Sequence, residues 1–302
     1  MRDAFIARLT EQARTDESIM LLTGDLGFNV VEGFRDAFPL QFLNCGVAEQ
    51  AMMSIAAGLA STHKRVFAYS IVNFATFRCL EQIRNDIAYH GYDVCVVAIG
   101  GGASYGTLGY SHHGLEDVAV MRPIPGMRIY SPADSLEVAS CVDEILEIGG
   151  PCYLRLGRQP GSSPHAGPPD ISTGLIELAR GTDVSLLVTG PLLPTALTAA
   201  AAAEEQGVSV QVVSVPRISP LDDAELLKVA GGRRIVTLEE HSTIGGLGSA
   251  VLESLARSRQ PHDVHILGYP SGGFDISGSH AFINNSTGLS PDAVALALVD
   301  QG

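Results

Sequence analysis

The amino-acid sequence predicts an α/β protein with two domains, each built on an open parallel sheet. Short apolar runs alternate along the chain with longer segments of helical period, which is the order that helix-covered parallel sheets require. The apolar runs are almost continuous, as is typical of strands buried on both faces. The length of 302 residues corresponds to about two domains at roughly 150 residues each.

The expected elements follow one another along the whole chain. Runs rich in Val, Ile and Leu predict strands at 19–23, 65–70, 93–99, 128–130, 152–156, 184–188, 208–213, 234–238 and 264–267. Amphipathic periodicity predicts helices at 2–14, 48–61, 74–89, 133–148, 195–206, 222–229, 246–257 and 291–299. Ser131, Ser219 and Ser290 each precede a proline, so we expect them to cap the helices that follow.

One segment separates the two domains. Residues 157–174 read GRQPGSSPHAGPPDISTG, which is rich in Gly, Pro and Ser and has no apolar periodicity. We therefore expect a first domain at 1–160, a linker at 161–178 and a smaller second domain at 179–302.

Composition excludes several classes of function. The net charge of -14 and the lack of a basic stripe argue against nucleic-acid binding. No apolar run approaches the roughly 20 residues of a membrane-spanning helix, and the first residues lack the apolar core of a signal peptide. The 5 cysteines contain no CxxC pair, so we expect buried free thiols in a reducing cytoplasm and no metal site.

A carboxylate opens the apolar helix expected at 48–61. The residues after Glu49 and Gln50 read AMMSIAAGLA, which predicts a helix buried on every side. An acidic residue in a first turn is often no more than a partner of the helix dipole. Burial would also favour the neutral form of Glu49, which makes the residue a candidate proton donor near neutral pH.

Three further features are candidates for a site. Ile71, Phe74 and Phe77 are spaced three apart, which fits either core packing or an apolar wall for a planar heterocycle. The glycines at 100–102 follow an expected strand, where α/β sheets bind ligands, although a flexible loop explains them equally well. In the pair His112 and His113, a proton-transfer role is more plausible than zinc binding, which needs further ligands.

Together these features resemble the pyrimidine-binding and C-terminal domains of transketolase. The matching elements are GxxE ending at Glu49, the Phe-rich turn, the glycine loop, GxxH ending at His112, the LGRQ segment at 156–159, and TLEEHSTIGGLGSAV at 237–251. The resemblance covers essentially the whole chain. It implies a thiamine diphosphate (ThDP) cofactor and transfer of a two-carbon ketol unit from a ketose, or ketose phosphate, to an aldose.

The resemblance also implies a partner chain. The GDG…N motif that holds Mg²⁺ and the diphosphate in this family is missing, and residues 24–27 read GDLG instead. The chain is therefore similar to the C-terminal half of transketolase made as a separate subunit. The N-terminal-half subunit would carry the Mg²⁺ and diphosphate site, and two copies of this chain would pair within a heterotetramer.

The resemblance assigns cofactor-binding roles to individual residues. Glu49 matches the catalytic glutamate that hydrogen-bonds the pyrimidine ring nitrogen of ThDP. Phe74 matches the ring that stacks on the pyrimidine, and Phe77 and Ile71 would line the same pocket. Asp25 falls near the cofactor-side loop.

The resemblance assigns substrate-binding roles as well. His112 matches a catalytic histidine that contacts the donor, and Gly101 lies in the donor-binding loop. Arg2 and Arg158 match arginines that grip the acceptor phosphate, a task suited to guanidinium groups. A second donor histidine, expected near Gly101, and a substrate-selecting aspartate, expected near Leu108, are both missing. The donor therefore stays open between an ordinary ketose, an unusual ketose and a 2-oxoacid.

Two other functions fit the same pattern. The β subunit of a 2-oxoacid dehydrogenase shares the architecture and the glutamate. A non-catalytic assembly subunit would keep the fold without the chemistry, although it would have no physical reason to retain Glu49, Phe74 and His112 together.

Overall fold

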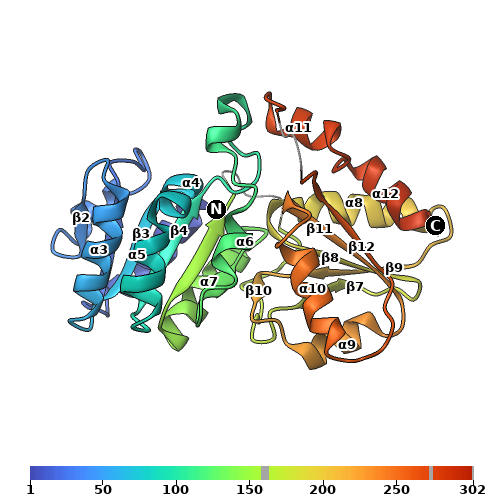
Figure 1. Ribbon diagram of the computed structural model, residues 1–302, viewed down its shortest axis with the longest axis horizontal. Helices are drawn as coiled ribbons and strands as arrows, with labels where there is room; N and C mark the ends of the chain where they lie inside the picture. Colours follow the sequence, from blue (N-terminus) through green and yellow to red (C-terminus); the bar gives the residue numbers. More distant parts are fainter. Residues whose placement is uncertain (158–162, 272–274, 301–302) are drawn as a thin grey trace.

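The computed structural model describes residues 1–157, 163–271 and 275–300, and it has two α/β domains that lie side by side (Figure 1). The order of strands in the first sheet is β10-β5-β6-β4-β3-β1-β2, and in the second it is β12-β11-β8-β9-β7. The expectation of two open α/β sheets is confirmed.

The first domain follows a strand-helix alternation. Its strands are β1 (Ile19–Thr23), β2 (Phe42–Asn44), β3 (Arg65–Ile71), β4 (Val94–Ile99), β5 (Arg128–Tyr130) and β6 (Cys152–Leu156). Its α-helices are α1 (Arg2–Ala13), α2 (Glu32–Ala37), α3 (Glu49–Ala60), α4 (Val72–Ala75), α5 (Leu80–Gln82), α6 (Asp117–Met121) and α7 (Ser135–Ile148). Short helical turns are η1 (Phe77–Cys79), η2 (Ile83–Ala88), η3 (Gly106–Leu108) and η4 (Tyr110–His112).

The second domain is smaller. Its strands are β7 (Ile176–Ala179), β8 (Val184–Val188), β9 (Val210–Ser214), β11 (Arg234–Ser242) and β12 (Val264–Tyr269). Its helices are the turn η5 (Gly190–Leu192), α8 (Leu193–Glu204), α9 (Asp223–Ala230), α10 (Leu247–Ala256), α11 (His280–Ser286) and α12 (Pro291–Val299). The strand β10 (Arg217–Ser219) comes from this half of the chain but pairs antiparallel with β5 of the first sheet.

Both sheets carry apolar side chains on two faces, as the continuous apolar strands predict. Every residue of β4 is buried, and the first sheet separates two apolar clusters built around Met52 and Phe5. The second sheet likewise separates clusters that include Leu186 and Leu187. The side chains of Leu186 and Leu187, which follow each other on β8, therefore pack on opposite faces of the second sheet.

The structure differs from the expected elements in several places. The helix expected at 74–89 is divided into α4, η1, α5 and η2, and the short helices α2, α6 and α11 were not expected. β2, β7 and β10 were not expected; β2 and β7 are edge strands with partly exposed residues, and β10 has only three residues. Ser290 caps α12 through its hydroxyl, as predicted. The predicted caps Ser131 and Ser219 are wrong, because the carboxylates of Asp134 and Asp222 cap α7 and α9.

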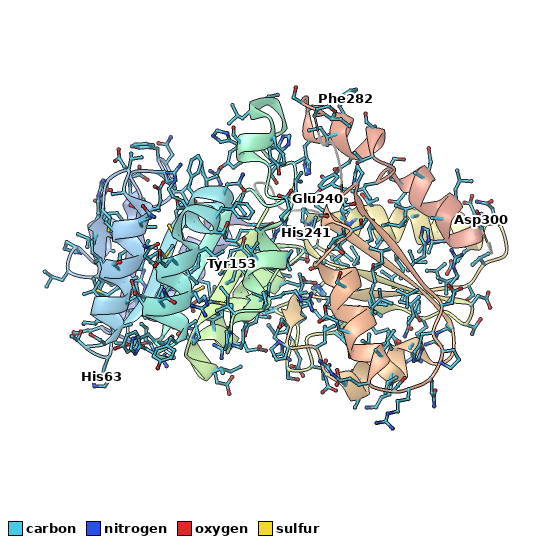
Figure 2. The ribbon with its side chains drawn as sticks, viewed as in Figure 1. His63, Tyr153, Glu240, His241, Phe282 and Asp300 are labelled. Carbon is cyan, nitrogen blue, oxygen red and sulfur yellow. The ribbon has the colours of Figure 1, made fainter. Side chains whose placement is uncertain are left out.

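A buried ion pair ties the domains together. The Arg155 Nε atom on β6 donates to the Asp117 carboxylate at 2.7 Å, and the same guanidinium donates to the Glu240 carbonyl oxygen on β11 at 2.8 Å. Tyr153 on β6 and His241 on β11 lie in the same region, where the two domains meet (Figure 2). This junction holds the end of the first sheet, where the glycine loop begins, against the second domain.

The cysteines and the lengths of the helices can be compared with the expectations drawn from composition. All five cysteines are free and four of them are buried, as expected. Within the described parts of the chain, no helix is long and apolar enough to cross a membrane.

Candidate active site

Glu49 is the first residue of α3, and its side chain is only 2% exposed. The N-terminus of a helix favours a negative charge at this position. Gly24, at the end of β1, lies against this carboxylate: a Cβ built on that glycine would lie 3.5 Å from Glu49 Cγ. The predicted burial of Glu49 is confirmed, and the carboxylate lies near the carboxyl end of β1.

A cation that the sequence analysis did not identify pairs with this carboxylate. The Arg78 guanidinium on η1 donates to Glu49 Oε2 at 2.7 Å. The guanidinium carbon also lies 4.3 Å from the centroid of the Phe74 ring, within the range of a cation–π interaction. The rule that buried charges are paired predicts some partner for Glu49, but not which one.

His112 also contacts Phe74. The two rings meet edge to face with their centroids 5.4 Å apart, and the Tyr105 ring is 6.3 Å from His112. Glu49, Arg78, Phe74 and His112 therefore form one continuous row, which we call the Glu49–His112 row.

Asn73 holds the loop that carries His112. Its side-chain amide donates to the carbonyl oxygens of Ser111 and His113, at 3.0 and 2.9 Å. The two histidines point to different places, as predicted: His113 is buried with Nε2 3.2 Å from the Gly106 carbonyl oxygen. Desolvation by burial lowers the pKa of His113, which favours its neutral form.

The other predicted residues lie around this row. Phe77 lines a cleft of about 360 Å³ with Asn73, Tyr110, Ser111, His113 and Glu116, and Ile71 is partly buried against the core. Asp25 is exposed with a φ of 56°, and its carboxylate accepts a hydrogen bond from the Asn44 amide at 3.0 Å.

The predicted substrate-binding residues are less closely connected to the row. Gly101 packs on the domain junction, where a Cβ would lie 2.6 Å from the Arg155 guanidinium carbon. Arg2 begins α1 and is half-buried. Arg158 lies outside the described residues.

The prediction that α3 is buried on every side is wrong. Ala51, Ser54 and Gly58 are exposed, and Ile55 is 38% exposed, so one face of the helix lies on the surface. Alanine, glycine and serine have little apolar surface, so they can stand on an exposed face as well as in a core. The sequence pattern therefore predicted too many buried positions on α3. The neighbouring Val47 is 75% exposed, and the site therefore opens beside an apolar surface.

In the described ranges, no three His, Cys, Asp or Glu side chains gather closely enough to hold a metal ion. The Glu49–His112 row contains a buried carboxylate, a half-exposed guanidinium, an aromatic ring and an imidazole, in that order. Such a set can hold a planar heterocycle by one polar edge and one face.

Comparison with known families shows where the chain belongs. The family model for the transketolase pyrimidine-binding domain matches residues 1–162, and that for the transketolase C-terminal domain matches residues 174–294. The chain belongs to the transketolase family. Dependence on thiamine diphosphate is a property of this family, and the Glu49–His112 row lies in the pyrimidine-binding domain.

Individual transketolase relatives cover nearly the same length. A subunit of the apulose-4-phosphate transketolase of Phocaeicola vulgatus is 36% identical over 89% of this chain and 87% of its own. A 6-deoxy-6-sulfo-D-fructose transketolase subunit of Clostridium sp. is 36% identical over 85% and 81%. A solved split-gene transketolase, described as an inactive β4 tetramer, matches with a TM-score of 0.88 at 34% identity over 98% of this chain and 96% of that one.

Proposed function

We propose that this chain is the pyrimidine-binding subunit of a split, ThDP-dependent transketolase. It would transfer a two-carbon ketol unit from a ketose donor to an aldose acceptor. The observation that carries the proposal is the buried Glu49 carboxylate, which Arg78 joins to the face of the Phe74 ring, with His112 in edge-to-face contact with the same ring.

The residues of this row fit the aminopyrimidine ring of ThDP. A planar group with N–H donors already lies there, since the Arg78 guanidinium both bonds Glu49 and lies over Phe74. An aminopyrimidine has the same planar shape and a comparable polar edge. We propose that Glu49 hydrogen-bonds the ring nitrogen, that Phe74 stacks on the ring, and that Ile71, Phe77 and Asp25 complete its surroundings.

The cofactor, when bound, supplies the carbon nucleophile that adds to a ketose carbonyl. The residues of this chain orient the reactants and move protons. His112 would exchange a proton with a substrate hydroxyl or carbonyl oxygen, and Asn73 keeps its loop in place. Arg2 and Arg158 would bind an anionic group of the acceptor, with Gly101 in the donor-binding loop.

The partner would be the N-terminal-half subunit of transketolase, carrying the Mg²⁺ and diphosphate site. The lack of a GDG…N motif in this chain supports this proposal. The relative from Phocaeicola vulgatus is named as one subunit of its enzyme, and the related β4 tetramer is described as inactive. The assembly would be a heterotetramer in which two copies of this chain pair.

The substrates would be sugars with an anionic substituent. One relative is named for a sugar phosphate and another for a sulfonated fructose, so the relatives differ in the ketose that they use. A phosphate and a sulfonate are both tetrahedral anions, which guanidinium groups bind well. We therefore propose an anionic ketose as donor.

The test uses the complex with the partner chain that carries the GDG…N motif. Ketol transfer from ketose phosphates to an aldose is measured for the wild type, for Glu49→Gln and for Glu204→Gln, an exposed control on α8. We expect activity in the wild type and the control, and a loss of at least about 100-fold in Glu49→Gln. Near wild-type transfer by Glu49→Gln would remove Glu49 from the chemistry.

The same complex separates the alternative functions. Turnover of pyruvate with a dye acceptor, without ketol transfer, would favour the β subunit of a 2-oxoacid dehydrogenase. If the partner chain associates but ThDP does not bind, the chain is an assembly subunit.

A further inference from the structure

We infer that Arg78 blocks the cofactor site in the chain alone. Its guanidinium occupies the position proposed for the aminopyrimidine ring, and the Arg78 side chain must move away before ThDP can bind. This inference rests on the proposed function, since it names a regulatory step at the same site.

The first step of the argument is the state of Glu49. Its carboxylate is buried, and a buried carboxylate without a partner is strongly disfavoured. The Arg78 guanidinium supplies that partner at 2.7 Å. In the chain alone, Arg78 therefore supplies the partner that the buried Glu49 carboxylate needs.

The second step is the overlap of the two binding modes. The guanidinium carbon lies 4.3 Å from the centre of the Phe74 ring while another part of the group bonds Glu49. A guanidinium presents adjacent nitrogens around one carbon, and so does the edge of an aminopyrimidine. A ring that stacks on Phe74 and bonds Glu49 needs the same face and the same carboxylate, so the two groups exclude each other.

The third step is that Arg78 can leave without disturbing the backbone. Its side chain is 44% exposed, so the solvent can receive the guanidinium. Glu81, three residues further along the same helical segment, is also exposed and offers a new partner at a helical spacing. Glu49 would then exchange the guanidinium for the pyrimidine ring as its hydrogen-bond partner.

The experiment titrates ThDP, with Mg²⁺, into the cofactor-free reconstituted complex by calorimetry. The variants are Arg78→Met, which keeps the apolar stem, and Arg84→Met, a matched control on η2 whose guanidinium bonds Asn85. We expect Arg78→Met to bind ThDP about twofold to fivefold more tightly, the size of effect of one partly exposed ion pair, and Arg84→Met to bind it as the wild type does.

Weaker ThDP binding by Arg78→Met would overturn the inference, because it would make Arg78 part of the cofactor site. Equal affinity for ThDP in wild type and Arg78→Met would overturn it as well. If Arg78→Met does not assemble, Arg78→Gln serves the same purpose with a polar neutral side chain. Failure of the wild-type complex to bind ThDP would reject the proposed function itself, which a failed Arg78 effect alone would not do.

Discussion

The side-chain amide of Asn73 holds His112 in position by bonding the backbone on both sides of it. It donates to the carbonyl oxygens of Ser111 and His113, at 3.0 and 2.9 Å. Asn73 belongs to α4, which also carries Phe74, so the aromatic face and the imidazole are positioned by one helical turn. The geometry of the site thus depends on a residue that touches neither ligand nor cofactor in the proposed function.

We therefore predict that Asn73→Ala lowers kcat/KM for the donor ketose by about 10- to 100-fold, because a loosened His112 loop is misplaced by about an ångström. The affinity for ThDP should change little, since Glu49 and Phe74 remain. Steady-state kinetics and ThDP titration of the reconstituted complex measure the two quantities. Asn85→Ala, on the exposed side of η2, is the matched control; an equal loss of ThDP affinity in Asn73→Ala would show that Asn73 supports the cofactor pocket instead.

The exposed apolar residues beside Glu49 lead to a second prediction. Val47 and Leu43 lie at the outer edge of the first sheet, where β2 and α3 are seen in Figure 1. A surface of this kind next to a site is typical of an interface. Val47→Asp should weaken association of the subunits by at least about tenfold, because a carboxylate is costly to bury between chains.

Sedimentation velocity over a range of concentrations measures that association. Leu227→Asp, a partly exposed position on α9 in the second domain, is the control and should assemble normally. Circular dichroism confirms that both variants are folded. Unchanged assembly of Val47→Asp would remove this surface from the interface.

The sequence predicts the fold and the site to different extents. β4 is recognisable because both of its faces are covered, which makes all six residues VCVVAI apolar. β7 reads IELA and lies at an edge, so it has no continuous apolar run, and its first three residues fall in the segment predicted as linker. Short apolar runs in the sequence therefore reveal strands that are buried on both faces, but not strands that lie at the edge of a sheet.

In the site, Glu49, Phe74 and His112 are visible in short motifs because each stands at a recognisable local position. Arg78 and Asn73 are not, because their roles arise from contacts across 29 and 38 residues of chain. No local periodicity encodes such a pairing. The exposed face of α3 was missed for a related reason, since small residues fit either a core or an interface.

A third prediction concerns the domain junction. Arg155 and Asp117 are buried and bonded at 2.7 Å, so removing one partner leaves an uncompensated charge. Arg155→Met should reduce the free energy of unfolding by about 3–5 kcal/mol. Arg257→Met, which breaks an exposed ion pair with Asp223, should change it by less than about 1 kcal/mol. Urea unfolding measures both, and equal effects would mean that the junction contributes no more than a surface pair.

The last prediction follows from His241, which is buried on β11 with its Nε2 3.3 Å from the Ala119 backbone nitrogen. Desolvation by burial lowers the pKa of His241 to about 4, from an ordinary value of 6.5. The unfolded chain therefore binds a proton at this residue between pH 6.5 and 4 while the folded chain does not. Stability should be full above pH 6.5 and fall as the pH drops towards 4, by about 3 kcal/mol in total.

Carboxylates also titrate in this range, so the contribution of His241 is read from a difference. His241→Gln keeps a hydrogen-bonding side chain but does not ionise, and its loss of stability relative to wild type should shrink as the pH falls from 6.5 to 4. Urea unfolding at half-unit steps of pH measures this difference. A difference that stays constant over the range would mean that His241 takes up its proton in the folded chain as readily as in the unfolded one, and that the domain junction admits water.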